Sequence, residues 1–151
     1  MVIIVKKYVL LVLLIGILIS SIYHSRYFLV SAFFQYNHFI NIEGNIYIEP
    51  DFPQQDIPNI TMFLSEAKAR IKKTFGSQPA HSIILFAHSD NALKTLGSNQ
   101  YGTTHRSFFG QYIIIGPNGL NVDVIAHELV HLEIGERLGY LKTITELPVW
   151  F

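Results

Sequence analysis

Residues 127–131 read His-Glu-Leu-Val-His, and this H-E-x-x-H run constrains the fold more than any other feature of the chain. On an α-helix, positions i and i+4 share a face, so His127 and His131 can present their imidazole nitrogens to one metal ion. Glu128 then lies about 100° further round the same helix, close to such a metal without having to bind it. The spacing therefore predicts that this stretch is helical.

The residues around the run carry the signals of a helix over residues 122–138. Asn121 is suited to the N-cap position, and Gly139 is the residue type that often follows a helix C-terminus. Arg137 would lie in the last turn, where a cation interacts favourably with the helix dipole. Apolar residues occupy most sides of the segment, which predicts that the helix is buried.

Two histidines at this spacing suit Zn²⁺, and a carboxylate beside them suits a general base. Zinc lowers the pKa of a bound water from about 15.7 toward 7, so a hydroxide-like nucleophile exists at neutral pH. We therefore predict a zinc site with His127 and His131 as metal ligands and Glu128 as the catalytic base. The competing interpretation is that both histidines are core residues hydrogen-bonded to the backbone, which is costly beside a carboxylate without a metal.

Length, charge and cysteine content exclude several other classes of function. A chain of 151 residues allows one domain with an appendage. The formal net charge is zero and lysine and arginine do not cluster, so no nucleic-acid partner is expected. Cysteine is absent, which excludes disulfides, cysteine zinc sites and thiol nucleophiles.

The N-terminal segment is expected to be a membrane anchor. Residues 8–23 are almost wholly apolar, and Lys6 and Lys7 precede them. A transmembrane helix needs about 20 apolar residues, and lysines favour the cytoplasmic side. We expect residues 1–26 to form an uncleaved signal anchor in the lipid bilayer, with the N-terminus cytoplasmic and the domain outside. The alternative is a signal peptide, whose removal would give a secreted protein.

The rest of the chain divides into a helical or juxtamembrane connector, residues 27–44, and one domain, residues 45–151. Within the domain, periodicity and turn residues predict strands at 45–49, 82–87 and 111–115. They also predict helices at 59–75, from Ser89 or Asp90 to 96, and at 122–138, with a loop over 99–110. This order indicates an α+β fold in which a small twisted sheet packs on two helices.

The strand at 111–115 followed by the H-E-x-x-H helix resembles the zincin metallopeptidases. In that group a small twisted sheet packs on the motif helix, and its edge strand lies along the cleft. The run Tyr112-Ile-Ile-Ile115 resembles that edge strand, which implies that an extended peptide pairs with it. The run Leu147-Pro-Val-Trp-Phe151 narrows the resemblance to gluzincin-like (peptidase MA-like) proteins, where such a stretch precedes a helix bearing Glu-Gly.

The resemblance implies a membrane-anchored, zinc-dependent metallopeptidase that hydrolyses a peptide or protein substrate. In the family, the glutamate of the Glu-Gly helix is the third zinc ligand, and its place would lie just beyond Phe151. We therefore expect an incomplete or truncated form whose hydrolysis is weak or absent. The alternative is a catalytically inactive, zincin-derived membrane protein that acts as a binding module.

Other acidic and histidine side chains are weaker candidates for the metal. Helical geometry points Glu133 and Glu136 away from the face of the two histidines, so we expect them to be solvated or to support the ligands. Glu146 precedes the presumed next helix and is wrongly placed for the family's third ligand. Three further histidines lie in or beside predicted loops, where we expect exposure: His81, His88 and His105.

Overall fold

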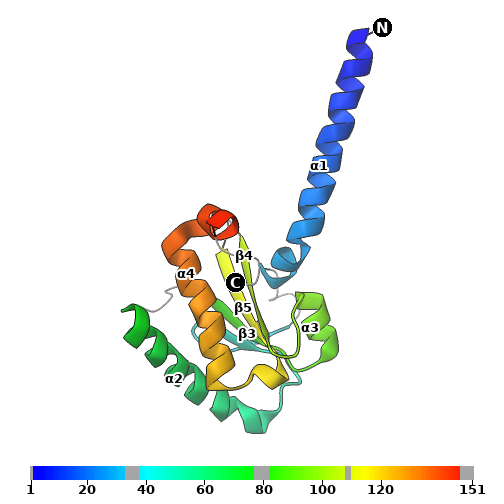
Figure 1. The fold of residues 1–151 in the computed structure, drawn as a ribbon. Helices are drawn as coiled ribbons and strands as arrows, with labels where there is room; N and C mark the ends of the chain where they lie inside the picture. The colour runs from blue at the N-terminus through cyan, green and yellow to red at the C-terminus, as the bar shows by residue number, and fades with distance from the viewer. Residues whose placement is uncertain (1, 33–37, 77–81, 108–109, 147–151) are drawn as a thin grey trace.

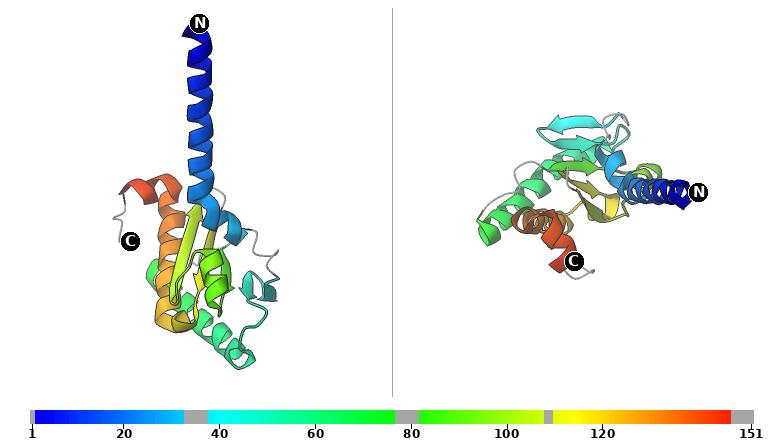
Figure 2. Two further views of the ribbon diagram at one scale, coloured as in Figure 1. Left: turned by 90° about the vertical axis from the view of Figure 1, so that its right-hand side faces the viewer. Right: turned by 90° about the horizontal axis from the view of Figure 1, so that it is seen from above.

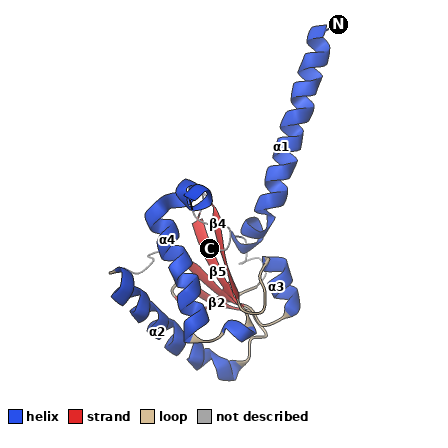
Figure 3. Ribbon diagram, viewed as in Figure 1, coloured by secondary structure: helices blue, strands red, loops and turns tan. Residues whose placement is uncertain are grey.

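The computed structural model describes residues 2–32, 38–76, 82–107 and 110–146 (Figure 1). Across these residues a long N-terminal helix, α1 (Val2–Ala32), projects from an α+β body. The body holds a five-stranded mixed sheet flanked by helices, as Figure 3 shows by colour. The predicted α+β class is confirmed.

The helix α1 runs from Val2 to Ala32, so it extends beyond the expected anchor, residues 1–26, into the expected connector. Its side chains from Tyr8 to Tyr23 are exposed, and the views in Figures 1 and 2 show the helix extending away from the body. Contacts with the body are made to α3, β4 and β5. Among the residues that the structure describes, no helix combines the length and hydropathy of a membrane span.

The sheet has the strand order β1-β2-β3-β5-β4. Its strands are β1 (Ile40–Glu43), β2 (Ile46–Ile48), β3 (Ile83–Phe86), β4 (Gly102–Ser107) and β5 (Gly110–Ile115). The three central strands, β2, β3 and β5, are parallel, whereas β1 and β4 run antiparallel to their neighbours. The sheet thus begins within residues 27–44, where the sequence pattern predicts a connector.

Helices cover both faces of the sheet. The helices α2 (Ile57–Phe75) and α4 (Val122–Glu146) share one core with the sheet, and α3 (Asp90–Leu96) packs on the opposite face. Alternate residues of β3 serve the two cores, Ile84 and Phe86 on the first and Leu85 on the second. A central parallel strand buried on both faces has a continuous apolar sequence, which explains why the sequence revealed β3 and β5.

The predicted helix starts are confirmed where side chains cap them. Ser89 Oγ accepts a hydrogen bond from the Ala92 amide at 3.1 Å and begins α3. Asn121 Oδ1 accepts from the Val124 amide at 3.0 Å and begins α4. These side chains satisfy amides that a helix N-terminus otherwise leaves without partners.

The predicted end of the motif helix is only partly right. The helix α4 extends to Glu146, but Gly139 within it has φ 73° and ψ 163°, which is not helical. Glycine reaches this positive φ without the penalty that a Cβ atom carries. The helix therefore bends sharply at Gly139, and its last turns run in a new direction (Figure 1).

The predicted edge strand is wrong. Residues 112–115 belong to β5, which pairs with β3 on one side and with β4 on the other. The edge strand is β4, within the stretch 99–110 that the sequence predicts as a loop. Its sequence, Gly-Thr-Thr-His-Arg-Ser, has no apolar alternation. Pairing with β5 and packing on α4 form this strand, and such tertiary contacts override local preference.

Candidate metal and base site

The two motif histidines converge on one point beside α4. Their Nε2 atoms lie 3.0 Å apart, and their ring centroids lie 4.6 Å apart. Two nitrogen ligands of a tetrahedral zinc, with bonds of about 2.0–2.1 Å, are separated by about 3.3 Å. His127 is exposed and His131 is half-buried, so the rings are not enclosed in the core as the competing interpretation requires. The pair therefore fits two adjacent positions of a zinc site.

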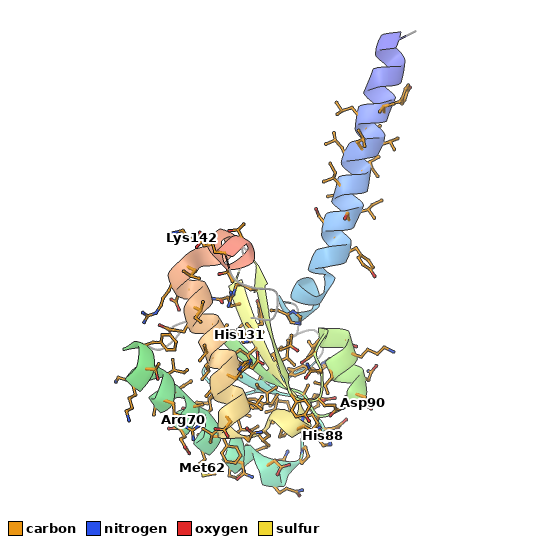
Figure 4. The ribbon with its side chains drawn as sticks, viewed as in Figure 1. Met62, Arg70, His88, Asp90, His131 and Lys142 are labelled. Carbon is orange, nitrogen blue, oxygen red and sulfur yellow. The ribbon has the colours of Figure 1, made fainter. Side chains whose placement is uncertain are left out.

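The surroundings of His131 favour its neutral form. Burial, followed by the charges of His127 and Arg106, lowers the pKa of His131 below its usual range. Neutral imidazole is the form that binds a metal. Figure 4 places His131 along the length of α4, clear of the helix ends. The lowered pKa therefore favours His131 in the form that could bind a metal.

Glu128 follows His127 on the same helix but is buried, with 7% of its surface exposed. Burial raises its pKa, and the hydrogen bond from Thr104 and the charge of His127 only partly oppose that rise. The Thr104 hydroxyl donates to Glu128 Oε2 at 2.6 Å. A carboxylate with increased proton affinity is better suited to accept a proton than an ordinary exposed glutamate.

The edge strand β4 runs alongside α4 and contacts the motif through alternate residues. A Cβ atom added to Gly102 would lie 3.1 Å from Glu128 Cγ, and Thr104 bonds to the Glu128 carboxylate. Arg106 donates through Nη2 to the His131 carbonyl oxygen. Side chains of a strand alternate between faces, so these three residues form one face turned toward α4. Sequence reasoning missed all three, because β4 has a polar sequence without the apolar alternation that marks a strand.

Arg106 also contacts β5 and a second residue of α4. Its Nε donates to Gln111 Oε1 at 2.9 Å, across the β4–β5 pair. Its guanidinium lies against Gly135 of α4, where any Cβ atom would overlap it. Burial lowers the pKa of Arg106, and no acidic neighbour opposes this among the described residues. The arginine thus joins β5, β4 and the backbone of the second histidine.

The remaining histidines lie elsewhere. His105 is on the opposite face of β4, where its Nε2 is 2.9 Å from the Leu96 carbonyl oxygen, and burial lowers its pKa. The expectation that His105 is exposed is therefore wrong, because it belongs to a strand packed on α3. His88 is exposed as predicted, and Figure 4 places it near the start of α3, away from His131. His81 lies outside the described residues.

The acidic residues of α4 give no third ligand. Glu133 is not solvated: it is 2% exposed, and its Oε1 lies 2.6 Å from Arg137 Nε. Arg137 in turn covers the Phe75 ring of α2 at 5.3 Å. Glu136 and Glu146 are exposed. Within the ranges that the structure describes, no group of three histidine or acidic side chains is placed to hold a metal.

The site therefore consists of a converging histidine pair, the buried carboxylate of Glu128 beside it, and a strand that contacts Glu128 and His131. The run Leu147–Phe151, which carries the gluzincin-like part of the resemblance, lies outside the described residues. No family model, no curated protein and no solved structure matches the chain. The resemblance to zincins and the zinc that it implies stay predictions.

Proposed function

We propose that this chain is a zinc-dependent peptide hydrolase of the zincin type, with gluzincin-like character. The observation that carries the proposal is the 3.0 Å approach of the His127 and His131 Nε2 atoms beside the buried carboxylate of Glu128. If two core histidines were close only by chance, their Nε2 atoms would have no reason to point at one place next to a carboxylate. His127 and His131 are the proposed ligands, and Glu128 is the proposed base.

The chain's own residues account for the proton transfers. A bound zinc ion supplies polarisation of the scissile carbonyl and an acidified water. Glu128 would accept a proton from the attacking water and pass it to the nitrogen of the leaving amine as the C–N bond breaks. Its raised pKa supports both steps, because a strongly acidic carboxylate would hold the proton too weakly.

The edge strand supports a peptide as the substrate. One side of β4 pairs with β5, and β4 is the last strand in the sheet order. An extended peptide can add to such an edge through backbone hydrogen bonds. The substrate peptide, which the sequence suggested would pair with Tyr112–Ile115, is therefore proposed to pair with β4, Gly102–Ser107. This strand also contacts the motif helix.

Zinc content tests the ligands. The purified 151-residue chain, dialysed against zinc and then against buffer, should retain equimolar zinc by mass spectrometry. Glu128→Gln should retain it as well, whereas His131→Ala should lose it. His88→Ala is the matched control, because His88 is an exposed histidine away from the pair. A wild-type chain without zinc would contradict the proposal.

Hydrolysis tests the base. We expect slow cleavage of fluorogenic casein that stops on addition of a zinc chelator and is lost in Glu128→Gln. Equimolar zinc without cleavage by the wild-type chain would instead favour the alternative, a catalytically inactive binding module derived from zincins.

Membrane anchoring by α1 is also part of the proposal. Its support is the run of exposed apolar side chains from Tyr8 to Tyr23 on a helix that extends away from the body. The chain should stay in the membrane pellet after carbonate extraction, and a variant lacking residues 2–23 should not. A mature product that begins after this segment would indicate a cleaved signal peptide and secretion.

A further inference from the structure

We propose that Thr104 is a positioning residue that fixes the orientation of the Glu128 carboxylate. This inference rests on the proposed function, because Glu128 matters as the base of that reaction. Thr104 touches neither histidine in any hydrogen bond that the structure describes, so it would act only through Glu128.

The hydroxyl selects one oxygen of the base. Thr104 Oγ1 lies 2.6 Å from Glu128 Oε2 and 3.4 Å from the Glu128 carbonyl oxygen. A hydroxyl has one proton to donate, and the shorter distance assigns it to Oε2. Oε2 is then held against β4, and Oε1 is the oxygen left to receive a proton.

Burial makes that single bond decisive. Glu128 is 7% exposed, so water cannot donate hydrogen bonds to the carboxylate in whichever rotamer it adopts. Among the described residues, Thr104 is the one side chain that donates to it. A glutamate side chain has several rotatable bonds, and a buried carboxylate adopts the rotamer that meets its donor.

The strand register supports the same assignment. Gly102 precedes Thr104 by one repeat of the strand, and a Cβ atom there would lie 3.1 Å from Glu128 Cγ and 3.3 Å from Oε1. The absence of a side chain at Gly102 leaves room for the carboxylate, and Thr104, the next residue on that face, orients it. Thr103, between them, faces the other way: its Oγ1 accepts from Ser98 Oγ at 3.1 Å.

The first test compares three variants of the full chain. Thr104→Val keeps the shape of the side chain but loses the hydroxyl, and Thr104→Ser keeps the hydroxyl. Thr74→Val is the matched control, because it makes the same change at an exposed position of α2, where the hydroxyl donates to the Arg70 carbonyl oxygen at 3.0 Å. Displacement of a reacting group by about 1 Å costs on the order of 10²-fold in rate.

We expect Thr104→Val to lower kcat for a fluorogenic peptide by about 10²-fold with KM unchanged. Thr104→Ser should recover most of the rate, and Thr74→Val should match the wild type. Zinc content should be the same in all of them. An unchanged kcat in Thr104→Val, or an equal loss in Thr74→Val, would overturn the proposal.

The second test needs neither zinc nor hydrolysis. Thr104→Val, Glu128→Gln and the double variant are melted as zinc-free proteins, and the shifts in Tm are compared as a double-mutant cycle. A double variant whose shift differs from the sum of the two single shifts supports the contact, and additive shifts overturn it. If the wild-type chain binds zinc but hydrolyses nothing, the proposed function fails, and this cycle still decides whether Thr104 orients Glu128.

Discussion

Glu49, partly buried at the end of β2, and Glu128, buried on α4, are two carboxylates that are each bonded to a hydroxyl and close to a histidine. Glu49 follows β2 and accepts three hydrogen bonds: from Ser89 Oγ at 2.5 Å, from the His88 amide at 2.7 Å and from the Ser89 amide at 2.9 Å. Glu128 accepts a single side-chain hydrogen bond among the described residues, from Thr104. The two carboxylates therefore differ mainly in how many donors surround them.

Their proton affinities differ accordingly. Burial raises the pKa of both groups, but the bonds from Ser89 and His88, with the charge of His88, outweigh it at Glu49 and lower the pKa. At Glu128 burial prevails, and the pKa is raised. Glu49 is thus a fixed anion that ties the end of β2 to the start of α3, whereas Glu128 keeps the proton affinity that acid–base chemistry needs.

The largest expected effect separates the two carboxylates by function. Glu128→Gln should lower kcat/KM by about 10²–10⁴-fold, because it removes the proposed base and keeps the shape. Glu49→Gln should leave hydrolysis unchanged and lower the free energy of unfolding by about 1–2 kcal/mol, because an amide nitrogen replaces an acceptor. Peptide hydrolysis and urea unfolding measure the two. If both variants hydrolysed the peptide at the same rate, Glu128 would not be distinguished from Glu49 as the catalytic base.

Gly135→Ala tests the arginine on the same face of β4. Alanine normally stabilises a helix interior by up to about 1 kcal/mol over glycine. Here the new methyl group would overlap the Arg106 guanidinium, which bonds to the His131 carbonyl. We expect a loss of about 1–3 kcal/mol in the free energy of unfolding, together with weaker zinc binding.

The control for that variant is Gly16→Ala, which lies in α1 and has no atom within 4 Å of the added methyl group. It should be neutral or slightly stabilising. A stabilised Gly135→Ala protein with normal zinc affinity would mean that Arg106 moves aside freely, and that its bond to the second histidine does not matter to the site.

The sequence was sufficient for the elements that carry strong local signals. The buried strands β3 and β5 have apolar sequences, and Ser89 and Asn121 mark the starts of their helices through short-range bonds. The spacing of the H-E-x-x-H run likewise predicted that His127 and His131 share a face, because helical periodicity alone decides that.

The environment of the site could not be predicted, because it depends on pairing between distant segments. The strand β4 has a polar sequence, and its role follows from its register: a slip by one residue would turn Thr103 and His105 toward α4 in place of Thr104. Glu133 illustrates the same limit. Helical geometry correctly predicted that its side chain points away from the histidines. Its burial, however, depends on how α4 packs, and there it is paired with Arg137.

The smallest expected effect is a difference in pH dependence between the two carboxylates in the zinc-free protein. For Glu49, the folded pKa is lowered, so its contribution to stability is present above the unfolded pKa of about 4.3 and is lost as the pH falls through the folded pKa. For Glu128, the folded pKa is raised, so its contribution is present below the unfolded pKa and is lost as the pH rises through the folded pKa.

Urea unfolding at about pH 4 and about pH 7 should therefore show opposite trends. The destabilisation caused by Glu49→Gln should shrink on acidification, and the change should be small because solvent partly screens this group. Glu128→Gln should instead gain stability relative to the wild type as the pH rises, because it removes the cost of ionising a buried carboxyl. Parallel trends in the two variants would mean that hydrogen-bond number does not distinguish the anchoring carboxylate from the proposed base.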